Sequence, residues 1–197
     1  MDRETVALSQ IADGVVLVKI SSFNSGTADE IADKLKDSSF DKGIVIDVRA
    51  NPGGQLKEAV ATAELFIGNG VIVSYQKVNE DPVIFKAENA SPIQSPLVVL
   101  IDRDSASAAE ILAGALQDRN RAVVIGERSM GKGTVQEFIS LNDGSKLELT
   151  VAKYRTPSGQ IIDGVGIEPD LAATDDEIAR RALQILTGLA TLRSKSS

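Results

Sequence analysis

Three short apolar runs constrain the fold of this chain more than any other feature of its sequence. They are Val15–Ile20, Gly43–Val48 and Leu97–Ile101, and each is followed by a segment whose apolar residues have helical spacing. Strands that are apolar along most of their length are typical of a sheet covered on both faces. The repeated strand–helix order predicts a mostly parallel sheet with right-handed crossovers, in a single α/β domain spanning residues 1–197.

Helix starts are indicated by the Ser/Thr-x-x-Glu pattern of a capping box, which occurs at Thr27, Ser107 and Thr174. The helix beginning at Ser107 is expected to end at about Gln117. A further helix is expected from about Leu56 to Phe66, because its apolar residues form one stripe. We therefore expect four helices, one after each buried run and one near the carboxyl terminus.

Further strands are expected at Val71–Tyr75, Ala122–Ile125, Thr134–Leu141 and Lys146–Tyr154. The last two are joined by Asn142-Asp143-Gly144, which is a hairpin signal. The polar stretch from Asn79 to Pro96 predicts a hairpin and an exposed loop. These segments indicate a small antiparallel sheet attached to the parallel core, so the fold class is mixed α/β.

The composition excludes several classes of function. The chain has no histidine and no cysteine, so it has no Ser-His or Cys-His pair, no disulfide and no thiolate zinc site. We expect no metal and no cofactor. The net charge of −7 disfavours nucleic acid, which requires a basic face. No apolar run has the length of a membrane span, and residues 1–4 do not have the pattern of a signal peptide.

Ser107 is the first candidate for a catalytic group. It follows a strand and begins a helix, where unpaired N–H groups and the helix dipole favour negative charge. The N–H of Ala108 could then stabilise an oxyanion. The alternative is structural, because Ser107-x-x-Glu110 is itself a capping-box pattern.

Lys132 is the candidate base, because without histidine a lysine must activate the serine. It lies 25 residues after Ser107 and between two glycines. A lysine acts as a general base only where its surroundings lower its pKa. If the segment is extended, residues 132, 134 and 136 share a face, and the Gln136 amide could orient the Lys132 amine. The structural alternative for Lys132 is a surface lysine in a turn, and the alternative for Gln136 is an ordinary exposed strand residue.

Two glycine-containing segments have a structural and a functional interpretation. Gly53 and Gly54 could simply permit a turn, or one of their N–H groups could complete an oxyanion hole with Ala108. Gly126–Lys132 matches G-x-x-x-x-G-K, which makes nucleotide binding a rival hypothesis. However, Gly133 stands where Ser or Thr is needed, and a strand rather than a helix is expected to follow.

Several segments together resemble the carboxyl-terminal processing proteases, also called tail-specific proteases, which are Ser-Lys peptidases. The matching segments are Ile46–Gly54, Asp102–Asp118, Gly126–Gln136 and Tyr154–Asp170. They occur in the family order and span about residues 12 to 190, which is far more specific than any single motif.

The resemblance implies a ClpP/crotonase-like core. It places the nucleophile on Ser107, the base on Lys132 and the group that orients the base on Gln136. The oxyanion donors correspond to the backbone N–H groups of Gly53 and Ala108. The implied activity is that of a serine endopeptidase that cleaves near protein C-termini through an acyl-enzyme. We expect the protein or peptide substrate to bind as an extended strand. The resemblance also implies an extracytoplasmic location, in periplasm, cell wall or thylakoid lumen.

The sequence departs from the family in one way. Family members usually carry a PDZ domain, and these 197 residues leave no room for one, so we expect the protease core alone. An alternative remains open, in which a resting or catalytically silent core acts as a binding module of the same fold. The natural substrate and the oligomeric state are not predicted.

Overall fold

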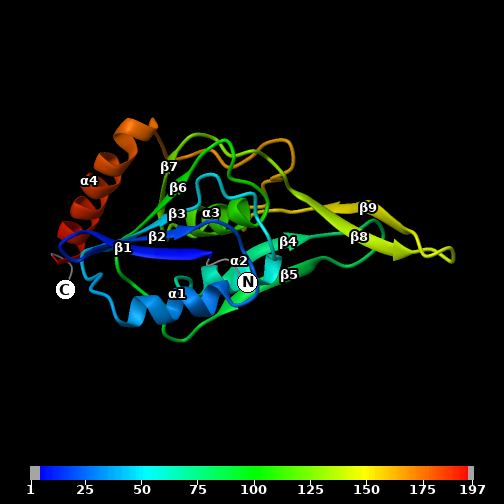
Figure 1. The fold of residues 1–197 in the computed structure, drawn as a ribbon, viewed down its shortest axis with the longest axis horizontal. Helices are drawn as coiled ribbons and strands as arrows, with labels where there is room; N and C mark the ends of the chain where they lie inside the picture. Colours follow the sequence, from blue (N-terminus) through cyan, green and yellow to red (C-terminus); the bar gives the residue numbers. More distant parts are fainter. Residues whose placement is uncertain (1–4, 195–197) are drawn as a thin grey trace.

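A six-stranded sheet forms the centre of the protein in the computed structural model, which describes residues 5–194. The strands lie in the order β1-β2-β3-β6-β7-β10 (Figure 1). Their bounds are β1 Val6–Ala12, β2 Val15–Ile20, β3 Gly43–Asp47, β6 Leu97–Ile101, β7 Val123–Gly126 and β10 Leu171–Ala172. Neighbours from β2 to β10 are parallel, whereas β1 pairs with β2 in antiparallel fashion. The prediction of a mostly parallel sheet is confirmed.

Helices cover both faces of this sheet. They are α1 (Thr27–Lys36), α2 (Leu56–Glu64), α3 (Ala108–Asp118) and α4 (Asp175–Ser194). On β3, Ile44 and Ile46 pack in the core that contains α1, α2 and α3, while Val45 packs in the core that contains α4. Successive strand residues point to opposite faces, so a strand with helices on both sides is apolar over most of its length, and in β3 only the last residue, Asp47, is charged. Figure 1 shows α4 apart from the other three helices.

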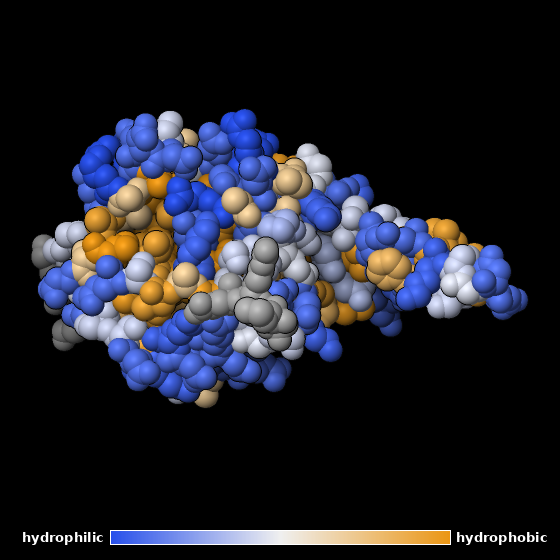
Figure 2. Space-filling model, viewed as in Figure 1, coloured by the Kyte–Doolittle hydropathy of each residue, from blue (hydrophilic) through white to orange (hydrophobic). Residues whose placement is uncertain are grey.

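Two smaller antiparallel pairs lie beside the main sheet. Their strands are β4 (Asn69–Tyr75), β5 (Val83–Glu88), β8 (Thr134–Ser140) and β9 (Lys146–Lys153). An isolated bridge between Ser74 and Arg155 connects β4 to the chain that follows β9. The β8–β9 hairpin projects from the body of the molecule (Figure 1), and Figure 2 shows it as a narrow extension of the surface. The predicted mixed α/β class with a small antiparallel appendage is confirmed.

Three strands were not predicted as such. β1 precedes the first predicted strand, and its residues Ser9, Gln10 and Ile11 are exposed because β1 lies at the sheet edge. Such a strand lacks the continuous apolar run that identifies its neighbours. β5 lies inside the stretch predicted as a hairpin and loop, and β10 has only two residues.

The predicted capping box at Thr27 is not formed. Gly26 is the N-cap of α1, and the Thr27 hydroxyl instead donates to Asn24 O at 2.8 Å. The Glu58 carboxylate on α2 accepts the N–H groups of Gly26 and Ala28, each at 3.1 Å. A carboxylate from a neighbouring helix thus satisfies the free N–H groups that a cap would otherwise satisfy.

The expectation about targeting concerns residues 1–4, which lie outside the described residues. Within residues 5–194, no helix is both long enough and apolar enough to cross a membrane.

Thr62 offers a test of the packing around α2. Its side chain is fully buried, and its hydroxyl has no hydrogen-bond partner within the described residues. Thr62→Val removes the unpaired hydroxyl at nearly constant volume, so we expect the free energy of unfolding to rise by about 1–2 kcal/mol. Urea denaturation followed by circular dichroism measures this change.

The matched control is Thr27→Val. The Thr27 hydroxyl is also buried, but it both donates to Asn24 O and accepts the Asn24 N–H. We expect this variant to lose about 1–2 kcal/mol, because partners are left unpaired. Equal effects of the two substitutions would contradict the assigned hydrogen bonds.

Candidate active site

Ser107 lies between β6 and α3, at the carboxyl end of the sheet. The segments that follow parallel strands β2, β3 and β6 meet at this same edge, where α/β proteins commonly bind ligands. Ser107 has φ 54° and ψ −113°, and such a positive φ costs a residue other than glycine about 1–3 kcal/mol. The Ser107 N–H donates to Glu110 Oε2 at 2.8 Å, and the preceding Ala106 N–H donates to Asn51 O at 2.9 Å. These bonds hold the strained residue in place.

The glycine turn after β3 packs directly against Ser107. A Cβ atom on Gly53 would lie 2.8 Å from Ser107 Cβ and 3.1 Å from Ala108 N. Only glycine allows this approach, and Gly53 also has φ +106°. The structure therefore brings together three of the residues singled out in the sequence, namely Gly53, Ser107 and Ala108.

The backbone N–H groups near Ser107 differ in their availability. The Gly53 N–H donates to Asn51 Oδ1 at 2.8 Å, and the Gly53 carbonyl accepts the Phe23 N–H at 2.9 Å. Within residues 5–194, neither the Ala108 N–H nor the Gly54 N–H makes a hydrogen bond. Gly54 is exposed, whereas Gly53 is buried.

A buried carboxylate connects the serine segment to the lysine segment. Glu110, on the first turn of α3, has no exposed surface. Its Oε2 accepts the N–H groups of Ser107 and Lys132, both at 2.8 Å. Its Oε1 accepts the Ser129 hydroxyl at 2.6 Å and the Gly131 N–H at 2.7 Å. One side chain therefore fixes the backbones of both predicted catalytic residues.

The side chains of Lys132 and Gln136 are both exposed. Among the described residues, the Lys132 amine makes no hydrogen bond or ion pair, so it is not bonded to the Ser107 hydroxyl. The Gln136 amide donates to Thr134 Oγ1 at 3.3 Å and to Thr150 Oγ1 at 3.0 Å. The structure thus places Lys132 at the root of the hairpin near Ser107, and it keeps Gln136 bonded across the hairpin.

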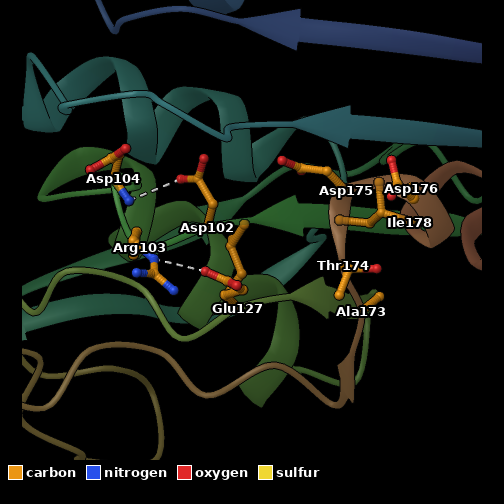
Figure 3. A pocket seen from close by; sticks show the side chains of 10 residues that line it. Asp102, Arg103, Asp104, Glu127, Ala173, Thr174, Asp175, Asp176 and Ile178 are labelled. Carbon is orange, nitrogen blue, oxygen red and sulfur yellow. Dashed lines mark hydrogen bonds and ion pairs between the residues drawn. The ribbon is translucent and has the colours of Figure 1, made fainter.

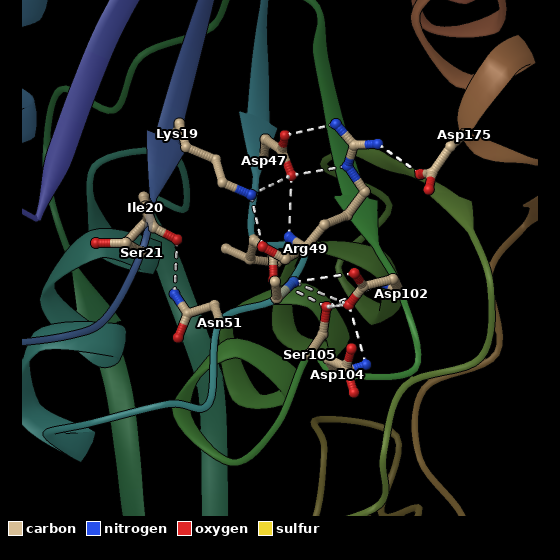
Figure 4. Close-up of polar contacts among 12 residues, drawn as sticks. Lys19, Ile20, Ser21, Asp47, Arg49, Asn51, Asp102, Asp104, Ser105 and Asp175 are labelled. Carbon is tan, nitrogen blue, oxygen red and sulfur yellow. Dashed lines mark hydrogen bonds and ion pairs between the residues drawn. The ribbon is translucent and has the colours of Figure 1, made fainter.

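A charged network supports the segment before the glycine turn (Figure 4). Asp47 accepts Arg49 Nη2 at 2.8 Å and Lys19 Nζ at 3.2 Å, and Arg49 also binds Asp175 at the start of α4. Both Asp102 oxygens accept the Ala50 N–H. Burial raises the pKa of Asp47, but the hydrogen bonds of Arg49 and the Lys19 charge outweigh it and leave that pKa below its ordinary value.

A cavity of about 430 Å³ lies beside this network, beyond the ends of β6 and β7 (Figure 3). Its lining includes Asp102, Asp104 and Glu127 but neither Ser107 nor Lys132. The Arg103 guanidinium binds Glu127 at 2.9 Å across one side of it. Across the described residues, no three His, Cys, Asp or Glu side chains are grouped so that they could hold a metal ion.

Two site residues were not recognised as such in the sequence. Glu110 was interpreted only as part of a capping box, and the Ser107 N–H bond to Glu110 does have this form. Its other three bonds come from residues 129–132, which no local pattern connects to it. Asn51 was not singled out in the sequence, although the Asn-x-Gly spacing of an Asx turn is a signal for its bond to Gly53.

A model of peptidase family S41 matches residues 14–173 of the chain. A carboxyl-terminal-processing protease of Synechocystis sp. is 34% identical and aligns with 100% of this chain and 52% of its own length. The carboxy-terminal processing protease CtpA of Bacillus subtilis is 37% identical, and the alignment covers 90% of this chain and 39% of that protein. The chain thus spans about half or less of the length of these relatives.

Solved structures have the same fold. A photosystem II D1 C-terminal processing protease superposes with a TM-score of 0.76 at 29% identity, covering 95% of this chain and 53% of that one. A lipoprotein from Streptococcus agalactiae has a TM-score of 0.80 at 17% identity, covering 95% of this chain and 71% of that one. The second likeness shows the fold alone.

Glu110→Gln tests the carboxylate that joins the two segments. The amide would place an N–H donor against N–H or O–H groups that now donate to an oxygen. We expect the free energy of unfolding to fall by about 2–4 kcal/mol, measured by urea denaturation. Glu127→Gln is the control, because Glu127 forms an exposed pair with Arg103 and should change stability by less than about 1 kcal/mol. If Glu110→Gln left the free energy of unfolding unchanged, the proposed role of the Glu110 carboxylate in joining the two segments would be refuted.

Asp47→Asn tests the charged network through its pH dependence. A folded-state pKa below the unfolded value means that the carboxylate contributes stability above the unfolded pKa of about 3.9, which is lost as pH falls through the folded pKa. We therefore expect the unfolding free energy of the unmodified protein to fall below about pH 4 more steeply than that of Asp47→Asn.

Asp13→Asn is the control for this measurement. The Asp13 pair with Lys42 is exposed, so 1 M salt should screen its contribution while that of the buried Asp47 persists. Identical acid profiles for Asp47→Asn and the unmodified protein in high salt would contradict the assignment.

Proposed function

Because the chain belongs to peptidase family S41, we propose that it carries the core of a serine endopeptidase of the carboxyl-terminal processing type, with Ser107 as nucleophile and Lys132 as general base. The observation that carries this proposal is the Glu110 carboxylate, whose Oε2 accepts the N–H groups of both residues. The absence of histidine from the sequence is a second support, since it leaves lysine to activate a serine.

The proposed reaction is acyl transfer through Ser107. The neutral Lys132 amine takes the hydroxyl proton while the Ser107 oxygen attacks the peptide carbonyl. The resulting oxyanion accepts the Ala108 N–H and an N–H of the glycine turn, where the sequence expectation is Gly53. Protonated Lys132 then donates its proton to the leaving amine, and water releases the acyl group from Ser107.

Gln136 is proposed to orient the Lys132 amine through its side-chain oxygen. In the described structure this oxygen accepts the Thr150 hydroxyl at 3.1 Å. A carboxamide oxygen has two lone pairs, so this oxygen can accept the Lys132 amine as a second donor once the amine comes within reach. The Lys132 and Gln136 side chains are both exposed at the root of the projecting hairpin, so this approach requires no change in the sheet core.

The substrates we propose are proteins and peptides bound as extended strands and cut near their C-termini. The names of the relatives support this class, since they describe carboxyl-terminal processing proteases. We also propose action outside the cytoplasm, in periplasm, cell wall or thylakoid lumen. A relative named as chloroplastic, from Tetradesmus obliquus and 38% identical, supports the last of these.

A second candidate is a resting core that binds peptides without cleaving them. It is favoured by one observation, namely that Lys132 is not bonded to Ser107 while Gln136 is bonded to Thr150. This candidate predicts peptide binding without turnover. Reaction of Ser107 with a serine-directed phosphonate probe at alkaline pH distinguishes the two, because only an activated hydroxyl is labelled.

The test of the proposed function is digestion of an unfolded protein that ends in apolar residues, with the products identified by mass spectrometry. We expect cleavage near the C-terminus, and a loss of at least about 10³-fold in rate for Ser107→Ala and for Lys132→Ala. Gln136→Ala should lower the rate without abolishing it. Lys146→Ala, at the far end of the hairpin, is the control and should retain full activity. Undiminished cleavage by Ser107→Ala would refute the proposal.

A further inference from the structure

Asn51 is a buried polar residue to which the proposed reaction assigns no part. It follows β3 and has no exposed surface. Its Nδ2 donates to Ile20 O at the end of β2 at 2.9 Å, as Figure 4 shows, and its Oδ1 accepts the Gly53 N–H at 2.8 Å. Its backbone oxygen accepts the N–H of Ala106, the residue before Ser107, at 2.9 Å. Asn51 therefore joins the segments after β2, β3 and β6.

These bonds make the Gly53 N–H unavailable to a substrate. For Gly53 to donate to an oxyanion, the Asn51 carboxamide would have to turn away. Since the carboxamide is buried, that turn would also leave Ile20 O without its donor, and an unpaired buried group costs about 1–3 kcal/mol. The Asn51 bonds thus favour a turn in which Gly53 keeps its present partner.

The next N–H of the turn is directed differently. Gly54 forms a parallel bridge with Phe23, in which the Gly53 carbonyl and the Gln55 N–H both bond to Phe23. In a planar trans peptide the N–H points opposite to the carbonyl of the same peptide unit, so the Gly54 N–H points away from Phe23, to the opposite side. Because β3 lies between β2 and β6 in the sheet, that side is the one on which Ser107 follows β6. The Gly54 N–H has no partner within residues 5–194.

We propose that Asn51 is a positioning residue that fixes the Asn51–Gly54 turn so that the Gly54 N–H, together with the Ala108 N–H, faces the oxygen formed by attack of Ser107. The inference rests on the proposed peptidase function and deepens it. In this arrangement the bond between Asn51 and Gly53 persists throughout the reaction.

The experiment uses a peptide boronic acid, whose boron forms a bond to the Ser107 oxygen and gives a tetrahedral adduct, while the hydroxyl proton passes to Lys132. A cleavage-product peptide serves as the ligand that has no tetrahedral centre. Asn51→Ala should lower kcat and the boronic-acid affinity by about 10²-fold, as loss of one oxyanion donor does. It should leave the affinity for the product peptide within about twofold.

Asn51→Ser provides the conservative comparison. The serine hydroxyl can accept the Gly53 N–H, though more weakly, but it does not reach Ile20 O. We expect it to recover part of the lost kcat and of the boronic-acid affinity. Rates are expressed per active site titrated with a phosphonate probe, so that a poorly folded fraction of either variant does not affect the result.

Asn89→Ala is the matched control. Asn89 makes the same pair of bonds away from Ser107, because its Oδ1 accepts the Ser91 N–H at 2.9 Å and its Nδ2 donates to Glu64 O at 2.7 Å. It should lose stability without losing kcat. An equal loss of kcat in Asn89→Ala, or unchanged kcat in Asn51→Ala, would overturn the inference.

A crystal structure of the boronic-acid adduct tests the donor itself. We expect the boron-bound oxygen within hydrogen-bond distance of Gly54 N and Ala108 N, with the Asn51–Gly53 bond intact. An oxygen bound to Gly53 N, with that bond broken, would overturn the inference while leaving the peptidase function in place. Failure of the proposed function itself would be seen in a different measurement, namely cleavage that does not depend on Ser107.

Discussion

The arrangement of this site depends on the four hydrogen bonds accepted by the buried carboxylate of Glu110. Three of the four donors are backbone N–H groups of Ser107, Gly131 and Lys132, and the fourth is the Ser129 hydroxyl. A carboxylate removed from water requires this number of donors to compensate for its lost hydration. The same requirement determines the path of the chain, because two segments far apart in sequence must both bring N–H groups to one side chain.

Asn51 plays a comparable part in the turn opposite Ser107, where its neutral carboxamide forms hydrogen bonds with the backbone groups of Ile20 and Gly53. Loops cannot satisfy their backbone groups through regular ladders, so side chains such as Asn and Glu take that part where loops are buried. The two residues fix different features of the site. Glu110 holds the segment that carries the lysine, while Asn51 determines which N–H groups of the glycine turn remain free.

The sheet was predictable because β2, β3 and β6 are largely buried and apolar along most of their length, with Lys19 and Asp47 as the charged exceptions near the ends of β2 and β3. Strand β1 was not predictable in this way, because an edge strand with exposed residues is not distinguished by its hydrophobicity. Ser107 and Lys132 could be singled out because the chain lacks histidine. The partners of Glu110 and the bond between Asn51 and Gly53 could not be predicted from the sequence, because a capping box and an Asx turn are common local patterns. Their wider connections depend on which segments the fold brings together.

The positive φ of Ser107 has a consequence for how this position can change over generations. Glycine adopts such a backbone conformation without strain, so replacing Ser107 with glycine would relieve torsional energy while deleting the hydroxyl. Selection for thermal stability alone would therefore favour glycine at this position, and under the proposed function that replacement would remove the nucleophile. Under the same proposal, the requirement for the hydroxyl is what keeps a serine at a place where the backbone favours a residue without a side chain.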